Sequence, residues 1–259
     1  MRFVVRPIEL QDVPQCIKLR IDNLGSLIIG RLPPYEGYAE EQEHSMRKRL
    51  LNADGSSGHI HFMKVVDKDG DQSEVVAYAR WEFYPKGLSE RKTLFEQNHG
   101  NDSDKKVDEF WKLREEAVKY FKRCTENIQG CPHILLALLV TAKEHRRRGA
   151  GSLLVRAGTD AADKNGLPCY LEASEEGRSL YQHHGFIDME TTDFDLTQHG
   201  LTGVERVTQM VRQPVPKKSE MKPTPGILER EVTPGIVLCF AVMLFCIVFP
   251  LGLNPYTRY

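Results

Sequence analysis

Residues Leu138–Val155 read L-L-V-T-A-K-E-H-R-R-R-G-A-G-S-L-L-V, and this stretch decides the fold. The apolar run Ile134–Val140 before it is too short for a core helix and ends in β-branched residues, which favours a buried strand. After a basic turn, apolar residues return at helical spacing from about Gly151. The sequence therefore predicts strand, loop and helix. The first N–H groups and the positive dipole end of such a helix bind phosphate.

The loop itself carries two glycines and three arginines. Gly149 and Gly151 are predicted to let the backbone approach a ligand closely, because neither has a Cβ. The arginines add charge that pairs with phosphate oxygens; they are Arg146, Arg147 and Arg148. A solvated basic loop is the alternative for a pattern this short. The spacing Arg146-x-x-Gly149-x-Gly151 resembles the acyl-CoA pyrophosphate loop of the GNAT superfamily of N-acetyltransferases, whose pattern is Arg or Gln, two residues, Gly, one residue, then Gly or Ala.

The segments that follow occur in the order that this resemblance requires. Periodicity and an Asn-Gly stop predict a helix over about Ser152–Lys164 and a strand over Pro168–Ala173. A short helix then carries Tyr181, four residues before Gly185 and Phe186, which looks like the second half of a GNAT site. The resemblance covers about Ile134–Phe186, and the wording of residues 170–174 is similar to that of a fungal branch of these enzymes.

The remaining segments fit the same α/β fold, a mixed sheet with helices. The expected strands are Phe3–Pro7, His59–Val66, Glu74–Phe83, Glu190–Leu196 and Val204–Val211, the second and third forming an antiparallel hairpin. Asp12 is predicted to cap a helix that begins at Val13. The apolar face of that helix is expected to hold Val13, Ile17, Ile21 and Leu24.

An insertion of about residues 85–130 separates the hairpin from the phosphate-loop strand. It begins with a charged stretch and continues into a predicted helix near Lys105–Ile128. One buried stripe is expected on this helix, formed by Val107, Trp111, Val118, Phe121 and Cys124. Packing on the core is the plain interpretation. The functional hypothesis is that the insertion and Leu27–Tyr38 border the acceptor pocket, the part that varies most between GNAT members.

Composition sets the outer limits. The chain has 259 residues, of which 41% are hydrophobic, and this suits one domain over residues 1–213 followed by a tail. A net charge of −1 gives no general attraction for nucleic acid. The six cysteines form no C-x-x-C pair and no spacing with histidine that is typical of zinc sites, so no metal is implied and a reducing compartment is favoured.

The C-terminal tail contains a second apolar feature. Residues Ile236–Leu253 have no charged side chain, and 18 residues of helix span about 27 Å, close to the thickness of a bilayer core. A proline-rich linker, 214–235, precedes them. We therefore predict a transmembrane helix that anchors the enzyme on the cytosolic side. An interfacial or intersubunit helix and a mispredicted gene end are the alternatives, and Pro250 and Gly252 weaken the far end of the helix.

The resemblance implies that acetyl-CoA is the donor and an amine of a small molecule or a protein the acceptor. The pyrophosphate would bind the backbone of residues 148–152, and the pantetheine arm would pair along residues 139–141. The residues assigned to acetyl-CoA are Leu139, Val140, Thr141, Arg146, Arg147, Arg148, Gly149, Ala150, Gly151, Ser152 and Ser174. Ser174 stands where many relatives have Asn and can still donate to the arm, with a shorter reach. Lys143 stands where many have Pro and leaves the strand end less rigid. Neither departure removes the expected CoA site, because the loop glycines and their spacing are intact.

Amine acetylation needs a base for the acceptor and an acid for the leaving thiolate. The resemblance gives the role of acid to Tyr181. Glu82 and Glu172 are both carboxylates that could serve as base, directly or through water, and both could instead be solvated or hydrogen-bonded strand residues. An acyl-CoA-binding module without turnover, anchored to a membrane, is the alternative function, and the acceptor's identity stays open.

Overall fold

The computed structural model describes residues 2–24, 37–51, 59–70, 74–87, 109–128 and 130–216. Residues Met1–Lys217 form one compact unit, and Lys218–Tyr259 are a second unit that lies outside the described residues. The predicted transmembrane segment Ile236–Leu253 and almost all of the proline-rich linker before it therefore lie outside them too. Among the helices that the structure does describe, none is both long and apolar enough to cross a membrane.

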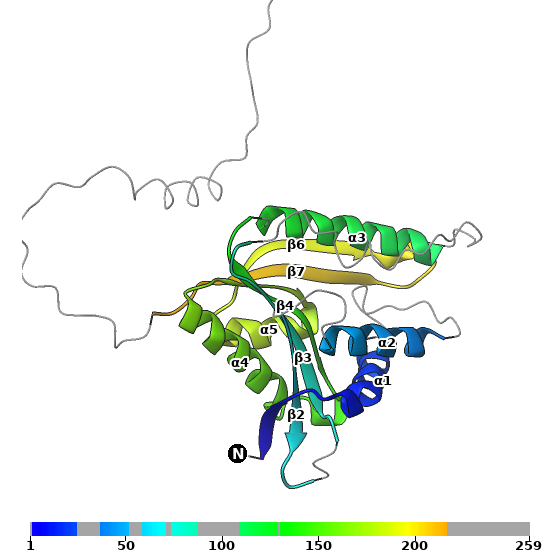
Figure 1. Cartoon of the computed structure of the whole chain (residues 1–259). Helices are drawn as coiled ribbons and strands as arrows, with labels where there is room; N and C mark the ends of the chain where they lie inside the picture. Colours follow the sequence, from blue (N-terminus) through cyan, green and yellow to red (C-terminus); the bar gives the residue numbers. More distant parts are fainter. Residues whose placement is uncertain are drawn as a thin grey trace, which may run out of the picture. The chain divides into compact units, whose positions relative to one another are not determined.

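The compact unit is built on one seven-stranded sheet with the order β1-β2-β3-β4-β5-β7-β6 (Figure 1). The strands are β1 Phe3–Pro7, β2 Ile60–Asp67, β3 Ala77–Tyr84, β4 His133–Thr141, β5 Cys169–Ser174, β6 Ile187–Asp195 and β7 Val204–Arg212. Neighbours pair antiparallel except β4 and β5, which are parallel. The predicted α/β fold with its hairpin and two late strands is confirmed.

Five α-helices and three short 3-10 turns cover the sheet within the described residues. The helices are α1 Val13–Leu24, α2 Tyr38–Leu50, α3 Glu109–Ile128, α4 Ala150–Asn165 and α5 Glu175–His183; the turns are η1 Leu10–Asp12, η3 Lys143–His145 and η4 Leu196–His199. The largest apolar cluster joins α4 and α5 to the central strands. A second cluster joins α1 and α2 to β3 and β4, and a third joins α3 to β6, β7 and η4. Figure 1 shows α3 running along β6 and β7, apart from α1 and α2.

Trp81 of β3 fixes the distance between α4 and the sheet. Its indole is fully buried, and its Nε1 donates a hydrogen bond to the Leu154 carbonyl oxygen at 3.3 Å. A Cβ placed on Gly158 of α4 would lie 2.1 Å from the indole, which no real contact allows. The helix therefore rests directly on the tryptophan because residue 158 has no side chain.

The prediction that Asp12 caps α1 is wrong. Asp12 closes the short turn η1 instead, where its carboxylate accepts the N–H of Glu9 at 2.7 Å. The same carboxylate is buried against the Lys64 ammonium of β2 at 2.6 Å. Because η1 runs straight into α1, the capping residue sits three positions earlier than the sequence suggested. The predicted apolar face is present, with Val13 and Ile17 buried in the second cluster.

The buried stripe of α3 is only partly as predicted. The helix begins at Glu109, and its buried face in the described residues holds Ala117, Tyr120, Cys124 and Ile128. Cys124 is confirmed, and Phe121 packs at the margin. The face turns toward residue 120 because the Tyr120 ring meets Phe194 of β6 edge-on at 5.7 Å. The side chains of Val107, Trp111 and Val118 lie outside the described residues.

Candidate active site

The centre of the sheet opens into a fork between β4 and β5. The two strands pair only at Ile134 with Cys169, Leu135 with Tyr170 and Leu136 with Leu171. Beyond these pairs β4 continues to Thr141 and β5 to Ser174 without pairing to each other. An irregularity between Arg80 and Trp81 of β3 also shifts the register of β4 at this point. The edge of β4 that faces the fork is therefore able to hydrogen-bond an extended ligand arm.

The predicted loop between β4 and α4 is a sharp turn that leads directly into the helix. Arg147 and Gly149 both have positive φ angles, 60° and 95°, so the chain turns sharply before the helix. The helix begins at Ala150, slightly earlier than predicted, and its first internal bond runs from the Leu153 N–H to the Gly149 carbonyl oxygen at 3.1 Å. The N–H groups of residues 150–152 thus precede the helical ladder and point toward the loop.

The two loop glycines differ in what surrounds them. A Cβ on Gly149 would meet no atom of the chain within 4 Å, so this position faces open space. A Cβ on Gly151 would lie 3.3 Å from a methyl group of Leu180 and 3.5 Å from Thr141 Oγ1. Gly151 therefore allows α4 to pack closely on β4 and α5. Only Gly149 has the open surroundings that both glycines were predicted to have.

The three arginines are exposed and differ in their contacts. Arg146 lies 3.4 Å from the Glu176 carboxylate of α5 and donates to the Thr141 carbonyl oxygen, also at 3.4 Å. Arg148 approaches His145 Nδ1 at 3.1 Å. Arg147 makes no ion pair with any residue that the structure describes. Arg146 thus connects the loop to the end of β4 and to α5, and Arg147 keeps its charge available.

Ser174 lies at the start of α5, and Tyr181 lies within that helix. Tyr181 is 8% exposed, and its ring meets Phe186 edge-on at 6.0 Å. Burial raises the pKa of Tyr181, so the hydroxyl keeps its proton at neutral pH, as an acid must. Ser174 caps α5 by accepting the N–H of Gly177 at 3.3 Å. Its hydroxyl hydrogen is left for another acceptor, such as an amide of the pantetheine arm.

Glu82 and Glu172 have different environments. Glu82 is 1% exposed, lies 3.0 Å from Arg80 Nε and accepts the Tyr84 hydroxyl at 2.5 Å. Glu172 directly follows Leu171, the last residue of β5 that pairs with β4. Desolvation raises the pKa of Glu172 to about 7, with a smaller contribution from the charge of Glu82. A carboxyl with this pKa can exchange protons near neutral pH.

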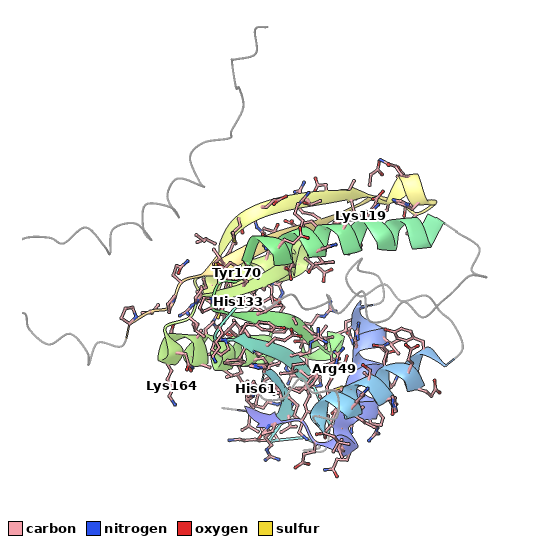
Figure 2. All side chains as sticks on the ribbon, turned by 45° about the horizontal axis from the view of Figure 1, so that its top comes forward. Arg49, His61, Lys119, His133, Lys164 and Tyr170 are labelled. Atoms are coloured by element: carbon pink, nitrogen blue, oxygen red, sulfur yellow. The ribbon has the colours of Figure 1, made fainter. Side chains whose placement is uncertain are left out.

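Sequence reasoning missed the polar residues around Glu82. Arg80 and Tyr84 share a face of β3 with Glu82, since alternate residues of a strand point the same way. His133 of β4 is fully buried beside the Tyr84 ring at 5.0 Å and the Tyr170 ring at 5.7 Å; Figure 2 labels His133 and Tyr170. Burial lowers the pKa of His133, so its ring is neutral. The alternation of Arg80, Glu82 and Tyr84 was the signal that could have found this cluster.

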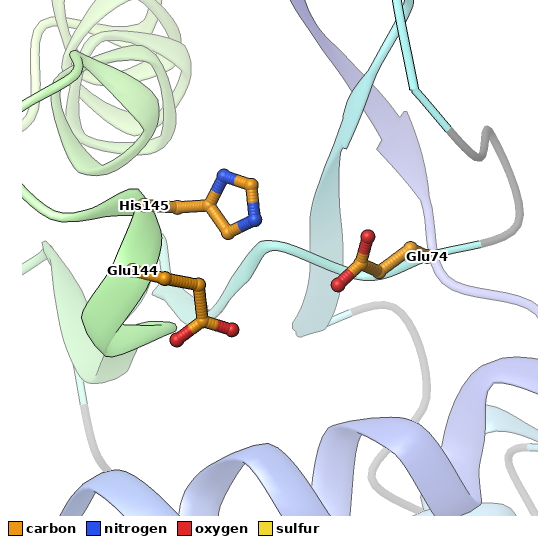
Figure 3. Close-up of side chains that lie close together, drawn as sticks. All are labelled: Glu74, Glu144 and His145. Carbon is orange, nitrogen blue, oxygen red and sulfur yellow. The ribbon is translucent and has the colours of Figure 1, made fainter.

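Three possible metal ligands meet near the phosphate loop, as Figure 3 shows: Glu74, Glu144 and His145. Their ligand atoms lie within 4.8 Å of one another. Both carboxylates are exposed, and the Nδ1 of His145 already contacts the Arg148 guanidinium. A cation bound through that nitrogen would displace or face a positive charge, so we assign no metal to the cluster.

Comparison with known proteins agrees with this geometry. The family model described as acetyltransferase (GNAT) domain matches residues 107–188, which hold β4, the phosphate loop, α4, β5 and Tyr181. No curated protein sequence is significantly similar to the chain. Residues 107–188 of the chain are therefore similar to the GNAT acetyltransferase domain family.

Two solved structures share the fold at low sequence identity. Arylalkylamine N-acetyltransferase 2 of Aedes aegypti has a TM-score of 0.53 at 16% identity, with 82% of this chain and 99% of that one covered. A Corynebacterium glutamicum protein described as histone acetyltransferase HPA2 and related acetyltransferase has a TM-score of 0.50 at 18% identity, with 84% and 99% covered. The predicted GNAT fold is confirmed. GNAT enzymes transfer acetyl groups from acetyl-CoA to amines.

Proposed function

We propose that this chain is an N-acetyltransferase that uses acetyl-CoA to acetylate an amine at the fork between β4 and β5. The observation that carries the proposal is the position of the fork. There the unpaired end of β4 lies beside the start of α4, and Glu172, whose carboxyl has a raised pKa, follows the last residue of β5 that pairs with β4. A phosphate anchor, an arm-binding edge and a base are the three elements that the reaction needs.

The donor would be seated by the backbone. Its pyrophosphate accepts hydrogen bonds from the N–H groups of residues 150–152, beside the free charge of Arg147. Its pantetheine arm extends along residues 139–141, and the Ser174 hydroxyl reaches an amide of the arm. The thioester then lies at the fork, where β4 and β5 separate after Leu136 and Leu171.

Of the two candidate bases, Glu172 fits the role better. Its position next to the fork and its pKa of about 7 allow it to accept a proton from an ammonium or from an intervening water. Glu82 is committed to Arg80 and Tyr84, and its charge acts on Glu172 from a distance. Tyr181 is the proposed acid that protonates the departing thiolate.

The variant Gly149→Glu tests the proposed pyrophosphate-binding site at the N-terminus of α4. A glutamate there places a negative charge and a bulky side chain in the open space above the N-terminus of α4. We expect calorimetry to show that CoA affinity falls by roughly a hundredfold or more, because several charge-assisted hydrogen bonds are lost. Unchanged CoA affinity in the folded variant would remove the loop from the donor site.

Gly166→Glu is the matched control for that variant. Gly166 ends the same helix, also has a positive φ angle of 64°, and a Cβ placed on it would likewise meet no atom within 4 Å. The backbone strain and the added charge are therefore comparable, but the change lies at the opposite end of α4. CoA affinity of this variant is expected to match that of the wild type.

We further propose that Ile236–Leu253 anchors the domain to a membrane with the active site in the cytosol. The support is its length and lack of charge in the sequence. Alkaline carbonate extraction of membranes should leave the full-length protein in the pellet, and truncation after Pro225 should release it. Full-length protein in the carbonate supernatant, or an unchanged distribution after truncation, would rule the anchor out.

A further inference from the structure

A surface pocket of about 370 Å³ lies along α4, one turn beyond the proposed pyrophosphate seat. It is bounded by the side of α4, by the turn between α5 and β6, and by the end of β7. Its polar side chains include Arg156, Thr159, Asp160, His183, His184 and Arg212. Neither the donor arm nor the acceptor chemistry described above uses these residues.

The pocket is continuous with the start of α4. Ser152, in the first turn of the helix, hydrogen-bonds His184 through Oγ and Nε2 at 2.7 Å. Arg156 lies four residues further along α4, a rise of about 6 Å. A ligand group one ribose away from a pyrophosphate at the helix start would therefore reach Arg156.

Two arginines, Arg156 and Arg212, bring positive charge to the pocket, and Asp160 opposes it. The pKa of His184 is lowered first by burial, then by Arg156, Arg212 and His183, against an opposing effect of Asp160. The Arg212 guanidinium is fixed in place by the Asp163 carboxylate at 2.7 and 2.8 Å and by the His184 carbonyl oxygen at 2.9 Å. A Cβ on Gly185 would lie 3.6 Å from Arg212 Nε, so the turn passes close to the arginine.

Two groups in the pocket are free to bind an anion. Arg156 is exposed and makes no ion pair or hydrogen bond through its side chain with residues that the structure describes. His183 Nδ1 contacts the Ser179 carbonyl oxygen at 2.7 Å, so Nδ1 carries the proton and donates. Its Nε2 makes no contact with residues that the structure describes and lies beside Arg156 in the pocket lining.

We propose that this pocket binds the 3′-phosphate of the CoA donor, a phosphate monoester, chiefly through Arg156 with His183 beside it. The inference rests on the proposed function, because it requires a pyrophosphate at the start of α4. It adds a statement about specificity: the enzyme binds CoA more tightly than 3′-dephospho-CoA, the analogue that lacks this phosphate. Asp160, at the rim, limits the strength of the interaction.

The test compares the binding of CoA and 3′-dephospho-CoA by calorimetry, using the full chain and two variants. The wild type should bind CoA about tenfold more tightly, as expected for one or two charge-assisted hydrogen bonds. Arg156→Gln should lower this ratio toward one while leaving the affinity for 3′-dephospho-CoA unchanged. Lys164→Gln removes the same charge from an exposed site in the last turn of α4 and should leave the ratio intact.

Each alternative gives a different result. A wild-type ratio near one, or a ratio that Arg156→Gln does not change, overturns the inference and leaves the donor site standing if CoA still binds. Inorganic phosphate alone is a further probe. If it binds the wild type more tightly than Arg156→Gln, while the wild type binds CoA and 3′-dephospho-CoA equally well, the pocket binds a separate phosphate and the inference is wrong. If the wild type binds neither CoA form, the proposed function fails and the inference falls with it.

Discussion

Tyr181→Phe should lower turnover by about 10² to 10⁴ and leave CoA binding nearly unchanged, because it removes the proposed acid and nothing else. The ring stays, and with it the edge-on contact with Phe186. The hydroxyl is protonated throughout the assay range, since burial raises the pKa of Tyr181. Acetyl transfer is measured with a panel of amines, and CoA affinity by calorimetry.

A suitable control is Tyr78→Phe. Tyr78 is 1% exposed and packs with α1 and α2, so the same hydroxyl is removed from another buried ring, in a different apolar cluster. Turnover of this control should stay close to that of the wild type. If Tyr181→Phe also retained wild-type turnover, Tyr181 would be a packing residue of α5, and the thiolate would have to gain its proton elsewhere.

Glu172→Gln should lower kcat/KM by a comparable factor, about 10² to 10⁴, when acetyl transfer is measured above pH 7. A base acts only when it is deprotonated, and the pKa of Glu172 is about 7. Wild-type activity is therefore expected to decline as pH falls through about 7, and the variant should lack this decline. If the activity of Glu172→Gln still declined as pH falls through about 7, the decline would belong to another group and Glu172 would not be the base.

Glu82→Gln separates the two carboxylates. It removes a negative charge that raises the pKa of Glu172, so the acidic limb should move to lower pH and persist. Were Glu82 the base, the limb would disappear. The variant also leaves Arg80 without its partner at 3.0 Å in a buried site, so its folded fraction must be checked by circular dichroism.

The same Glu172→Gln variant has a signature in stability. A carboxyl whose folded pKa is raised binds its proton more tightly when folded, so its favourable contribution is present at low pH and is lost as pH rises through about 7. Glutamine has no such loss. At pH 5 the thermal midpoints of the variant and the wild type should therefore differ little. Above pH 7 the midpoint of the variant should be higher relative to that of the wild type than it is at pH 5.

The sequence predicted the secondary structure around the proposed donor site. The strand, loop and helix from Ile134 to Asn165 depend on local periodicity and on Gly149, whose φ of 95° suits glycine, and these signals are read within a few residues of each other. Pairing across the chain was not readable in this way. Nothing local shows that β7 enters between β5 and β6, or that Asp12 is held by Lys64.

The acceptor side was harder to predict. The face of α3 turned because Tyr120 meets Phe194, a contact between segments far apart in sequence. The proposed choice of Glu172 over Glu82 as base depends on partners distant in sequence, since Arg80 and Tyr84 contact Glu82 and the fork adjoins Glu172. Leu27–Tyr38, predicted to border the acceptor, lies almost wholly outside the described residues.

Two adjacent residues of β3 face the two halves of the proposed active site from opposite sides of the sheet. Trp81 faces α4 and sets how close that helix, with its phosphate seat, comes to the sheet. Glu82 faces the other way, and its charge acts on Glu172. A change in the twist or register of β3 would therefore alter two properties together: the distance between the sheet and the proposed donor site on α4, and the pKa of Glu172.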